Sequence, residues 1–269
     1  MVEGAELLSV AVAAGADVEA VYVAPEGADA PAVREVTATV LDGGGRVFDL
    51  AEGVMARVAS TVTPQPLLAV VSYRPSPWTC VDGATLVVVC VDVRDPGNLG
   101  TVIRTADAAG VDAVVCCDGT VDPTNPKTVR ATAGSLFHVP VIEGGATGGA
   151  LAELGARGFT SVATVVRGGT DYVAFDWNRP VALVLGNEAA GLDDDLAAGL
   201  DAGVTIPMAG RSESLNVGVS AAVLCFEALR QRRTGGTPGA VPARSTMSAM
   251  DGPATTATPT GTDGGDAAP

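Results

Sequence analysis

Residues 206–220 read Ile-Pro-Met-Ala-Gly-Arg-Ser-Glu-Ser-Leu-Asn-Val-Gly-Val-Ser and decide how the second half of the chain is expected to fold. A strand ends at Pro207, since proline lacks the N–H that the next ladder bond needs. A polar loop follows, and an amphipathic helix starts near Ser214 and Asn216, which are cap-type residues. We expect that helix to bury a stripe formed by Val219, Ala222, Val223, Phe226 and Leu229.

Length and composition narrow the class of protein. The chain has 269 residues, enough for two modest domains, and 47% of them are apolar while only 4% are aromatic. No apolar run approaches the roughly 18 residues that span a bilayer, and no signal peptide is visible, so a membrane protein is excluded. The five cysteines lack metal-ligand spacing, which favours a reduced, cytoplasmic setting without a metal site.

The net charge of −15 is unfavourable for nucleic-acid binding when it is taken alone. The distribution of the positive charges points the other way. Nearly all of them are arginines, whose planar forks suit phosphates. Five basic residues fall in or near the polar loops that follow the predicted strands and would make a local basic site: Arg94, Arg104, Lys127, Arg130 and Arg211.

The chain divides into four stretches by pattern. Residues 1–75 predict a small α/β domain, with helices at 6–14 and after an Asp49 cap, and strands at 18–23 and 67–71. Residues 76–84 are rich in turn signals and indicate a linker. Residues 85–233 alternate apolar strands with helices, which predicts an α/β fold with a mainly parallel sheet covered by helices. Residues 234–269 contain almost no large apolar residue and indicate a disordered tail. The strands of the third stretch are expected at 86–91, 113–117, 161–166, 181–185 and 204–206.

The strand at 86–91 leads into a turn and a helix. We expect Asn98 to cap that helix, which would end at Gly110. Its apolar face would be Leu99, Val102, Ile103 and Ala106. Arg104 projects from another face, and by spacing alone it is an ordinary surface arginine. The turn does not match the G-x-G-x-x-G pattern of dinucleotide folds.

Three segments follow one another along the chain: residues 98–104 (Asn-Leu-Gly-Thr-Val-Ile-Arg), 185–191 (Leu-Gly-Asn-Glu-Ala-Ala-Gly) and 206–220. In this order they resemble the three motifs of the SpoU (TrmH-like) RNA 2'-O-ribose methyltransferases, a family of the SPOUT class. The resemblance covers residues 85–233 and implies a C-terminal trefoil knot. More loosely, Val2-Glu3-Gly4 and Thr63-Pro64-Gln65 resemble the ends of the L30e-like substrate RNA-binding domain that precedes many such enzymes. Members usually carry a basic segment before the Val-Glu-Gly stretch, so either the true start lies upstream of Met1 or this protein does without that segment.

The resemblance implies an enzyme that uses S-adenosyl-L-methionine to methylate a ribose 2'-hydroxyl in structured RNA, either rRNA or tRNA. It implies a homodimer that needs no metal, with catalytic residues Asn98, Arg104, Glu188, Ser214 and Asn216. The implied cofactor pocket is formed by Thr164, Val165, Gly186, Asn187, Ile206, Met208, Ser214, Leu215 and Asn216. The implied RNA contacts are Arg104 and Arg130, the latter in a stretch (130–134) similar to the family's R-x-S-x-G.

The implied role of Arg104 is open to physical argument. The family assigns this arginine to the reacting ribose, often as a general base, but arginine stays protonated in proteins. We prefer that it positions the 2'-hydroxyl and stabilises the developing alkoxide. The simpler interpretations are a solvent-facing loop glutamate for Glu188, plain helix caps for Ser214 and Asn216, and a solvated helix arginine for Arg130.

Two other functions are compatible with the sequence. One is a catalytically silent SpoU-like protein that binds RNA or assists ribosome assembly, which the acidic charge favours weakly and the intact motif residues oppose. The other is a nucleotide-binding α/β enzyme of metabolism, which would show no dependence on RNA. The identity of the target RNA and nucleotide is not predicted by the sequence.

Overall fold

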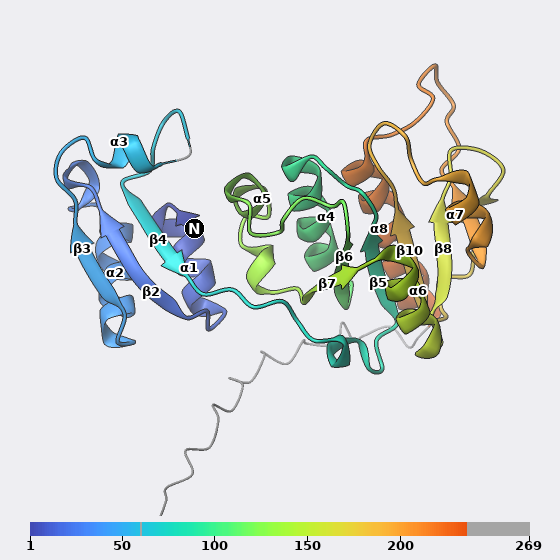
Figure 1. Ribbon diagram of the computed structural model, residues 1–269, viewed down its shortest axis with the longest axis horizontal. Coiled ribbons are helices and arrows are strands. Elements are labelled where there is room, and N and C mark those ends of the chain that lie inside the picture. Colours follow the sequence, from blue (N-terminus) through green and yellow to red (C-terminus); the bar gives the residue numbers. More distant parts are fainter. Residues whose placement is uncertain (60, 236–269) are drawn as a thin grey trace, which may run out of the picture.

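The computed structural model describes residues 1–59 and 61–235, which form two α/β units (Figure 1). The N-terminal unit holds a four-stranded sheet in the order β1-β4-β2-β3, in which β2 and β3 are parallel and β4 is antiparallel to both neighbours. Its helices and strands are β1 (Val2–Glu3), α1 (Ala5–Ala13), β2 (Val18–Val23), η1 (Pro25–Gly27), α2 (Pro31–Asp42), β3 (Arg46–Asp49), α3 (Met55–Val58) and β4 (Leu67–Val71). Buried residues of α1 and α2, among them Leu8 and Val36, belong to the same core as Val21 and Ala69 of the sheet.

The predicted small α/β domain is confirmed, but some of its elements differ from the prediction. The helix α2 and the strand β3 were not predicted. The helix expected after an Asp49 cap is wrong, because Asp49 is the last residue of β3 and α3 begins only at Met55. The intervening Gly53 has a φ of +74°, a left-handed conformation that a continuous helix cannot contain.

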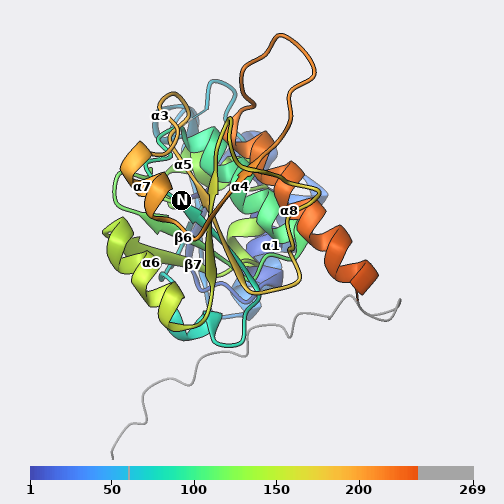
Figure 2. The same cartoon turned by 90° about the vertical axis from the view of Figure 1, so that its right-hand side faces the viewer.

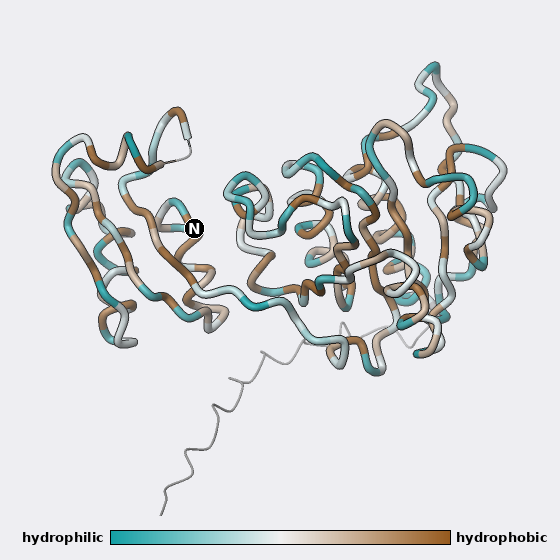
Figure 3. The backbone as a smooth tube through the Cα atoms, viewed as in Figure 1, coloured by the Kyte–Doolittle hydropathy of each residue, from teal (hydrophilic) through white to brown (hydrophobic). Residues whose placement is uncertain are grey.

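The second unit holds a seven-stranded sheet in which every pairing is parallel, in the order β7-β6-β5-β10-β8-β11-β9. All residues of the central strands β5 and β10 are buried, as expected for a sheet covered on both faces, and they form an apolar band in Figure 3. The predicted parallel α/β fold is therefore confirmed. Its elements are η2 (Trp78–Val81), β5 (Leu86–Cys90), α4 (Pro96–Ala109), β6 (Ala113–Cys117), α5 (Pro126–Ala131), η3 (Ser135–Phe137), β7 (Val141–Gly145), α6 (Thr147–Ala156), β8 (Thr160–Thr164), β9 (Thr170–Asp171), β10 (Val181–Leu185), α7 (Asp194–Gly199), β11 (Ala202–Thr205) and α8 (Val217–Gly235).

Helices α4 and α8 lie side by side on one face of this sheet, while α6 packs on the other face (Figure 2). The predicted apolar face of α4 is confirmed, and its left-handed C-cap is Gly110. The stripe predicted for α8 is wrong, since Val219 and Phe226 are 46% and 47% exposed. The apolar residues that α8 buries are instead Val217, Ala221, Leu224, Cys225 and Ala228.

Two predicted segments, the linker and the C-terminal tail, overlap with helices of the structure. The stretch predicted as a linker contains η2, whose Val81 is fully buried against the second sheet. Helix α8 runs through Gly235, and the remainder of the predicted tail, residues 236–269, lies outside the described residues.

Candidate active site

A pocket lies at the carboxyl ends of β8, β10 and β11, below the loop that joins β11 to α8. Parallel strands direct their following loops to one edge of the sheet, which is where ligands bind in open α/β folds. Eight of the predicted cofactor residues line this pocket: Thr164, Val165, Gly186, Asn187, Ile206, Met208, Ser214 and Leu215. Thr164 is fixed there by a 3.0 Å hydrogen bond from its hydroxyl to the Val184 carbonyl oxygen.

Gly186 has a specific role at the mouth of this pocket. A Cβ atom added there would lie 2.4 Å from the carbonyl carbon of Gly191, far inside contact distance. The loop after β10 folds back on itself at this point, with mutual backbone hydrogen bonds of 2.9 Å between Asn187 and Gly191. Any side chain at Gly186 would therefore force the loop out of this conformation.

A second, polar cavity adjoins the first and shares Asn187, Glu188 and Ala189 with it. Its other lining residues are Arg94, Asp95, Pro96, Asn98 and Asn216. The first pocket, lined by both apolar and polar residues, and the polar cavity thus meet at the loop after β10. Such an arrangement suits two ligands that approach each other end to end.

One hydrogen-bond chain crosses the polar cavity and joins all three predicted motifs. The Asn216 side-chain amide donates to Asn98 Oδ1 at 2.8 Å, and the Asn98 amide donates to Glu188 Oε1 at 3.0 Å. The Glu188 carboxylate also accepts the backbone N–H groups of Asp95 at 3.0 Å and Arg94 at 3.2 Å. Glu188 therefore holds the loop after β5 against the loop after β10.

These bonds change the acidity of Glu188. Partial burial opposes ionisation, but the hydrogen bonds from Asn98 and from the Asp95 and Arg94 backbones outweigh it and lower the pKa of Glu188 below its ordinary value. At neutral pH the group is an anion that accepts bonds. Its place in the site is that of a loop organiser.

The helix caps differ in part from the sequence prediction. Asp95, not Asn98, caps α4, because the Asp95 carboxylate accepts the Asn98 backbone N–H at 2.9 Å. This leaves the Asn98 side chain free of a capping role and available to the cavity. Asn216 does cap α8, accepting the Gly218 N–H at 2.9 Å, so the same side chain begins a helix and lines the cavity. Ser214 lies ahead of the helix and lines the first pocket.

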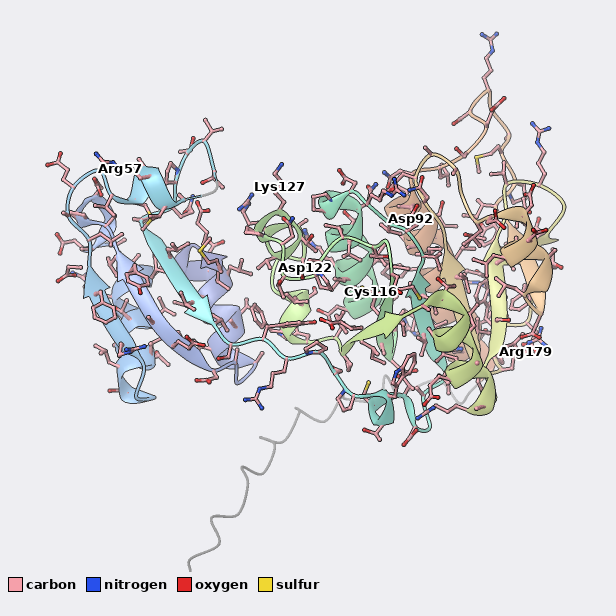
Figure 4. The ribbon with its side chains drawn as sticks, viewed as in Figure 1. Arg57, Asp92, Cys116, Asp122, Lys127 and Arg179 are labelled. Atoms are coloured by element: carbon pink, nitrogen blue, oxygen red, sulfur yellow. The ribbon has the colours of Figure 1, made fainter. Side chains whose placement is uncertain are left out.

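Asp92, which follows β5, is a functional candidate that sequence reasoning missed (Figure 4). The Asn187 amide donates to its backbone oxygen at 2.9 Å and to its carboxylate at 3.2 Å, while Arg94 Nε donates to the carboxylate at 2.8 Å. Its φ of +55° is unusual for a residue with a side chain. The available signal was an aspartate just beyond a buried apolar strand, which is a common place for site residues.

The two predicted RNA-contacting arginines lie outside both cavities. Arg104 is exposed on α4 and lines neither of them. Arg130 on α5 lies at the boundary of the two units, with its Nη1 atom 3.8 Å from Glu3 Oε2 on β1. The pocket and the cavity of one chain are therefore built without either arginine.

Two further observations concern metal ligands and membrane spans in the described part of the chain. Residues 1–59 and 61–235 contain no group of three or more His, Cys, Asp or Glu side chains placed to hold a metal ion. None of the helices in those ranges has the length and apolarity that crossing a membrane requires.

Comparison with known proteins agrees with this geometry. Residues 85–226 match the SpoU rRNA methylase family profile, and residues 1–69 match the MRM3-like substrate binding domain. A 23S rRNA (guanosine(2553)-2'-O)-methyltransferase of Bacillus subtilis is 41% identical over 69% of this chain and 73% of its own. An rRNA methyltransferase from Sinorhizobium meliloti, solved with AdoMet bound, superposes with a TM-score of 0.74 at 36% identity over 85% of this chain and 86% of its own. AviRb from Streptomyces viridochromogenes, also solved with AdoMet, gives a TM-score of 0.77 at 29% identity over 86% and 89%.

Proposed function

This chain belongs to the SpoU rRNA methylase family, and from that premise we propose that it methylates a ribose 2'-hydroxyl of ribosomal RNA with S-adenosyl-L-methionine. The observation that carries the proposal is the meeting of the first pocket and the polar cavity at Asn187 and Glu188. The residues of the first would hold the cofactor, and those of the second would hold the ribose next to it.

The residues of the first pocket fit this cofactor. Val165, Ile206 and Leu215 supply apolar side chains for the faces of an adenine ring, and Gly186 lets the loop after β10 fold tightly back on itself beside them. When bound, the cofactor supplies an activated methyl group on a sulfonium centre. The residues of this chain supply its position, and alignment of the reacting atoms alone is worth several kcal/mol.

The polar cavity is proposed to hold the ribose. Asn98, Glu188 and Asn216 form one hydrogen-bonded unit that fixes the shape of the cavity before RNA arrives. Arg104 is proposed to position the 2'-hydroxyl and stabilise the negative charge that develops on its oxygen. Arg130 is proposed to bind an RNA phosphate. To do so, its guanidinium would have to leave the Glu3 carboxylate and pair with the phosphate instead.

A homodimer is part of the proposal. The exposed side chains Val219 and Phe226 lie on one face of α8, and Arg104 is exposed on the adjacent α4. A second copy packed against this surface would cover the apolar side chains. It would also allow Arg104 of one chain to serve the cavities of the other, which is consistent with its absence from the cavities of its own chain.

The trefoil knot expected for this family also remains a proposal. Support comes from the strand order, in which β10 inserts between β5 and β8, and from the closeness of the loops after β10 and β11 in the first pocket.

Calorimetry with S-adenosylhomocysteine is the first test. We expect saturable binding without added metal in the micromolar range, about −8 kcal/mol. Failure to bind at millimolar ligand would contradict the enzyme proposal and favour a silent RNA-binding protein.

Mixing two inactive variants tests the shared site. An Arg104→Ala chain and an Asn216→Ala chain each lack one part, and a heterodimer would contain one complete site. Methyl transfer to 23S rRNA should then partly return on mixing. No recovery, with heterodimers verified by mass, would show that each chain works alone.

A further inference from the structure

The N-terminal unit is acidic, which is unfavourable for binding the phosphates of an RNA backbone. Residues 1–69 contain ten acidic side chains and three basic ones, Arg34, Arg46 and Arg57. A surface that tracks phosphates needs an excess of positive charge. If this unit binds RNA, its affinity must come from contacts that do not depend on net charge.

The sheet of this unit offers such contacts on the face away from α1 and α2. Phe48 on β3 is paired with Tyr22 on β2, which is paired with Leu68 on β4, so the three side chains form a row across one face. The Tyr22 and Phe48 rings are stacked, with centroids 5.5 Å apart and planes inclined by 21°. The Arg46 guanidinium lies 6.0 Å from the Phe48 centroid and donates to the Glu19 carbonyl oxygen at 3.3 Å.

Helix α3 covers the Leu68 end of this row, and the Phe48 end is exposed. Met55 of α3 packs with Leu68 and Tyr22, and both Met55 and Leu68 are 6% exposed. Phe48, on the edge strand β3, is 43% exposed. Arg57, labelled in Figure 4, marks the position of α3 on this unit. The Phe48 ring and the Arg46 side chain are thus exposed to solvent beside the buried apolar side chains of Leu68 and Met55.

We propose that Arg46, Phe48 and Tyr22 form a base-stacking surface for unpaired nucleotides of the substrate RNA. Every base has a neutral π face, so stacking on aromatic rings and guanidinium planes tolerates the acidic surroundings that repel phosphates. The inference rests on the proposed function, because it takes the ligand of the unit to be the same RNA.

The position of the surface fits this role. The Phe48–Tyr22–Leu68 row continues to Glu3 on β1, which pairs with Leu68 in register. Glu3 in turn faces Arg130 of α5 on the second unit. The stacking surface therefore shares a sheet face with the boundary to the unit that carries the two cavities.

The test uses the full chain and a fluorescent oligoadenylate of roughly ten nucleotides, within the span that single-strand-binding folds cover. Its matched ligand is an abasic oligomer of equal length and charge. The variants are Phe48→Ala, Phe48→Trp and Leu41→Ala; Leu41 is 55% exposed on α2 and serves as the control. Circular dichroism and melting verify that each variant is folded.

We expect Phe48→Ala to raise the Kd for oligoadenylate about tenfold at every salt concentration, with Phe48→Trp and Leu41→Ala near wild type. The abasic oligomer should bind much more weakly than oligoadenylate. An unchanged Kd in Phe48→Ala, equal binding of the abasic oligomer, or no oligoadenylate binding at millimolar concentration would overturn the proposal. S-adenosylhomocysteine binding, measured on the same samples, reports on the proposed enzyme function separately.

Discussion

Helices α4 and α8 pack against each other, yet they use their apolar residues differently. Helix α4 places Leu99, Val102, Ile103 and Ala106 in the core, each with no exposed surface. Helix α8 buries one stripe, which includes Leu224 and Ala228, and leaves Val219 and Phe226 at the surface. Helix α4 thus buries its apolar stripe completely within its own chain, whereas α8 leaves two large apolar side chains exposed.

The difference shows what a helical period can and cannot decide. The face of α4 away from its stripe carries polar residues such as Thr101 and Arg104, so only one orientation buries the apolar side chains. Helix α8 is apolar on two sides over its first turns, and spacing alone does not say which side faces the sheet. The side with the larger side chains was predicted as core and is the exposed one.

Ile103→Ala tests the buried side of α4 and should have the largest effect on stability. The side chain is fully buried, and removing its methyl and methylene groups leaves a cavity. We expect the free energy of unfolding to fall by about 2–5 kcal/mol, measured by urea denaturation. A loss below about 1 kcal/mol would mean that α4 is not anchored as described.

Arg104→Ala, at the next position, tests the exposed side of the same helix. We expect methyl transfer to fall by about 10²–10³-fold, as when an alkoxide-stabilising donor is removed. Unfolding free energy should change by no more than about 0.5 kcal/mol, since the side chain is exposed. Single-turnover rates near wild type would show that the assigned role is wrong.

Phe226→Asp tests the exposed side of α8. A carboxylate in an apolar dimer interface would lack a partner, so we expect the dimer Kd to rise at least about tenfold by analytical ultracentrifugation. Arg233→Asp, an exposed change near the end of the same helix, is the matched control. If the wild-type protein sediments as a monomer, the exposed apolar face of α8 is not a dimer interface and the prediction is wrong.

Glu188→Gln tests the contact that ties the first turns of both helices together, and its effect should be the smallest. The pKa of Glu188 is lowered in the fold, so its anion adds stability above the unfolded value of about 4.3, and this is lost as pH falls through the folded value. Because Glu188 is exposed, we expect at most about 1 kcal/mol. The difference in Tm between wild type and variant should be constant at neutral pH and shrink below about pH 4.

Buried strands were the part of the fold that the sequence predicted best. The strands β6 and β10 were predicted with their observed bounds, because their residues are apolar without interruption. The strand β7 was missed, since only its first two residues, Val141 and Ile142, are buried and the rest is Glu-Gly-Gly. Helix α2 was also missed, although Val33, Val36 and Val40 lie at helical spacing and are buried.

The candidate site could be predicted only through the family resemblance. Asn98 and Asn216 are 118 residues apart in the chain, and no local pattern predicts that their side chains meet. The positions of Arg130 beside Glu3 and of Asp92 beside Asn187 depend on loop conformations that follow from tertiary packing.

Asn216 begins helix α8 with its side-chain oxygen and bonds Asn98 with its nitrogen, while Asn98 in turn bonds Glu188. No one of the three loops can leave its place without removing a partner from another. Order in one loop therefore lowers the entropic penalty for ordering the others. A ligand that orders the loop after β11 therefore lowers the entropic penalty for a second ligand that binds to the loop after β5. Cofactor and RNA are then expected to bind cooperatively, each strengthening the affinity for the other by the same factor.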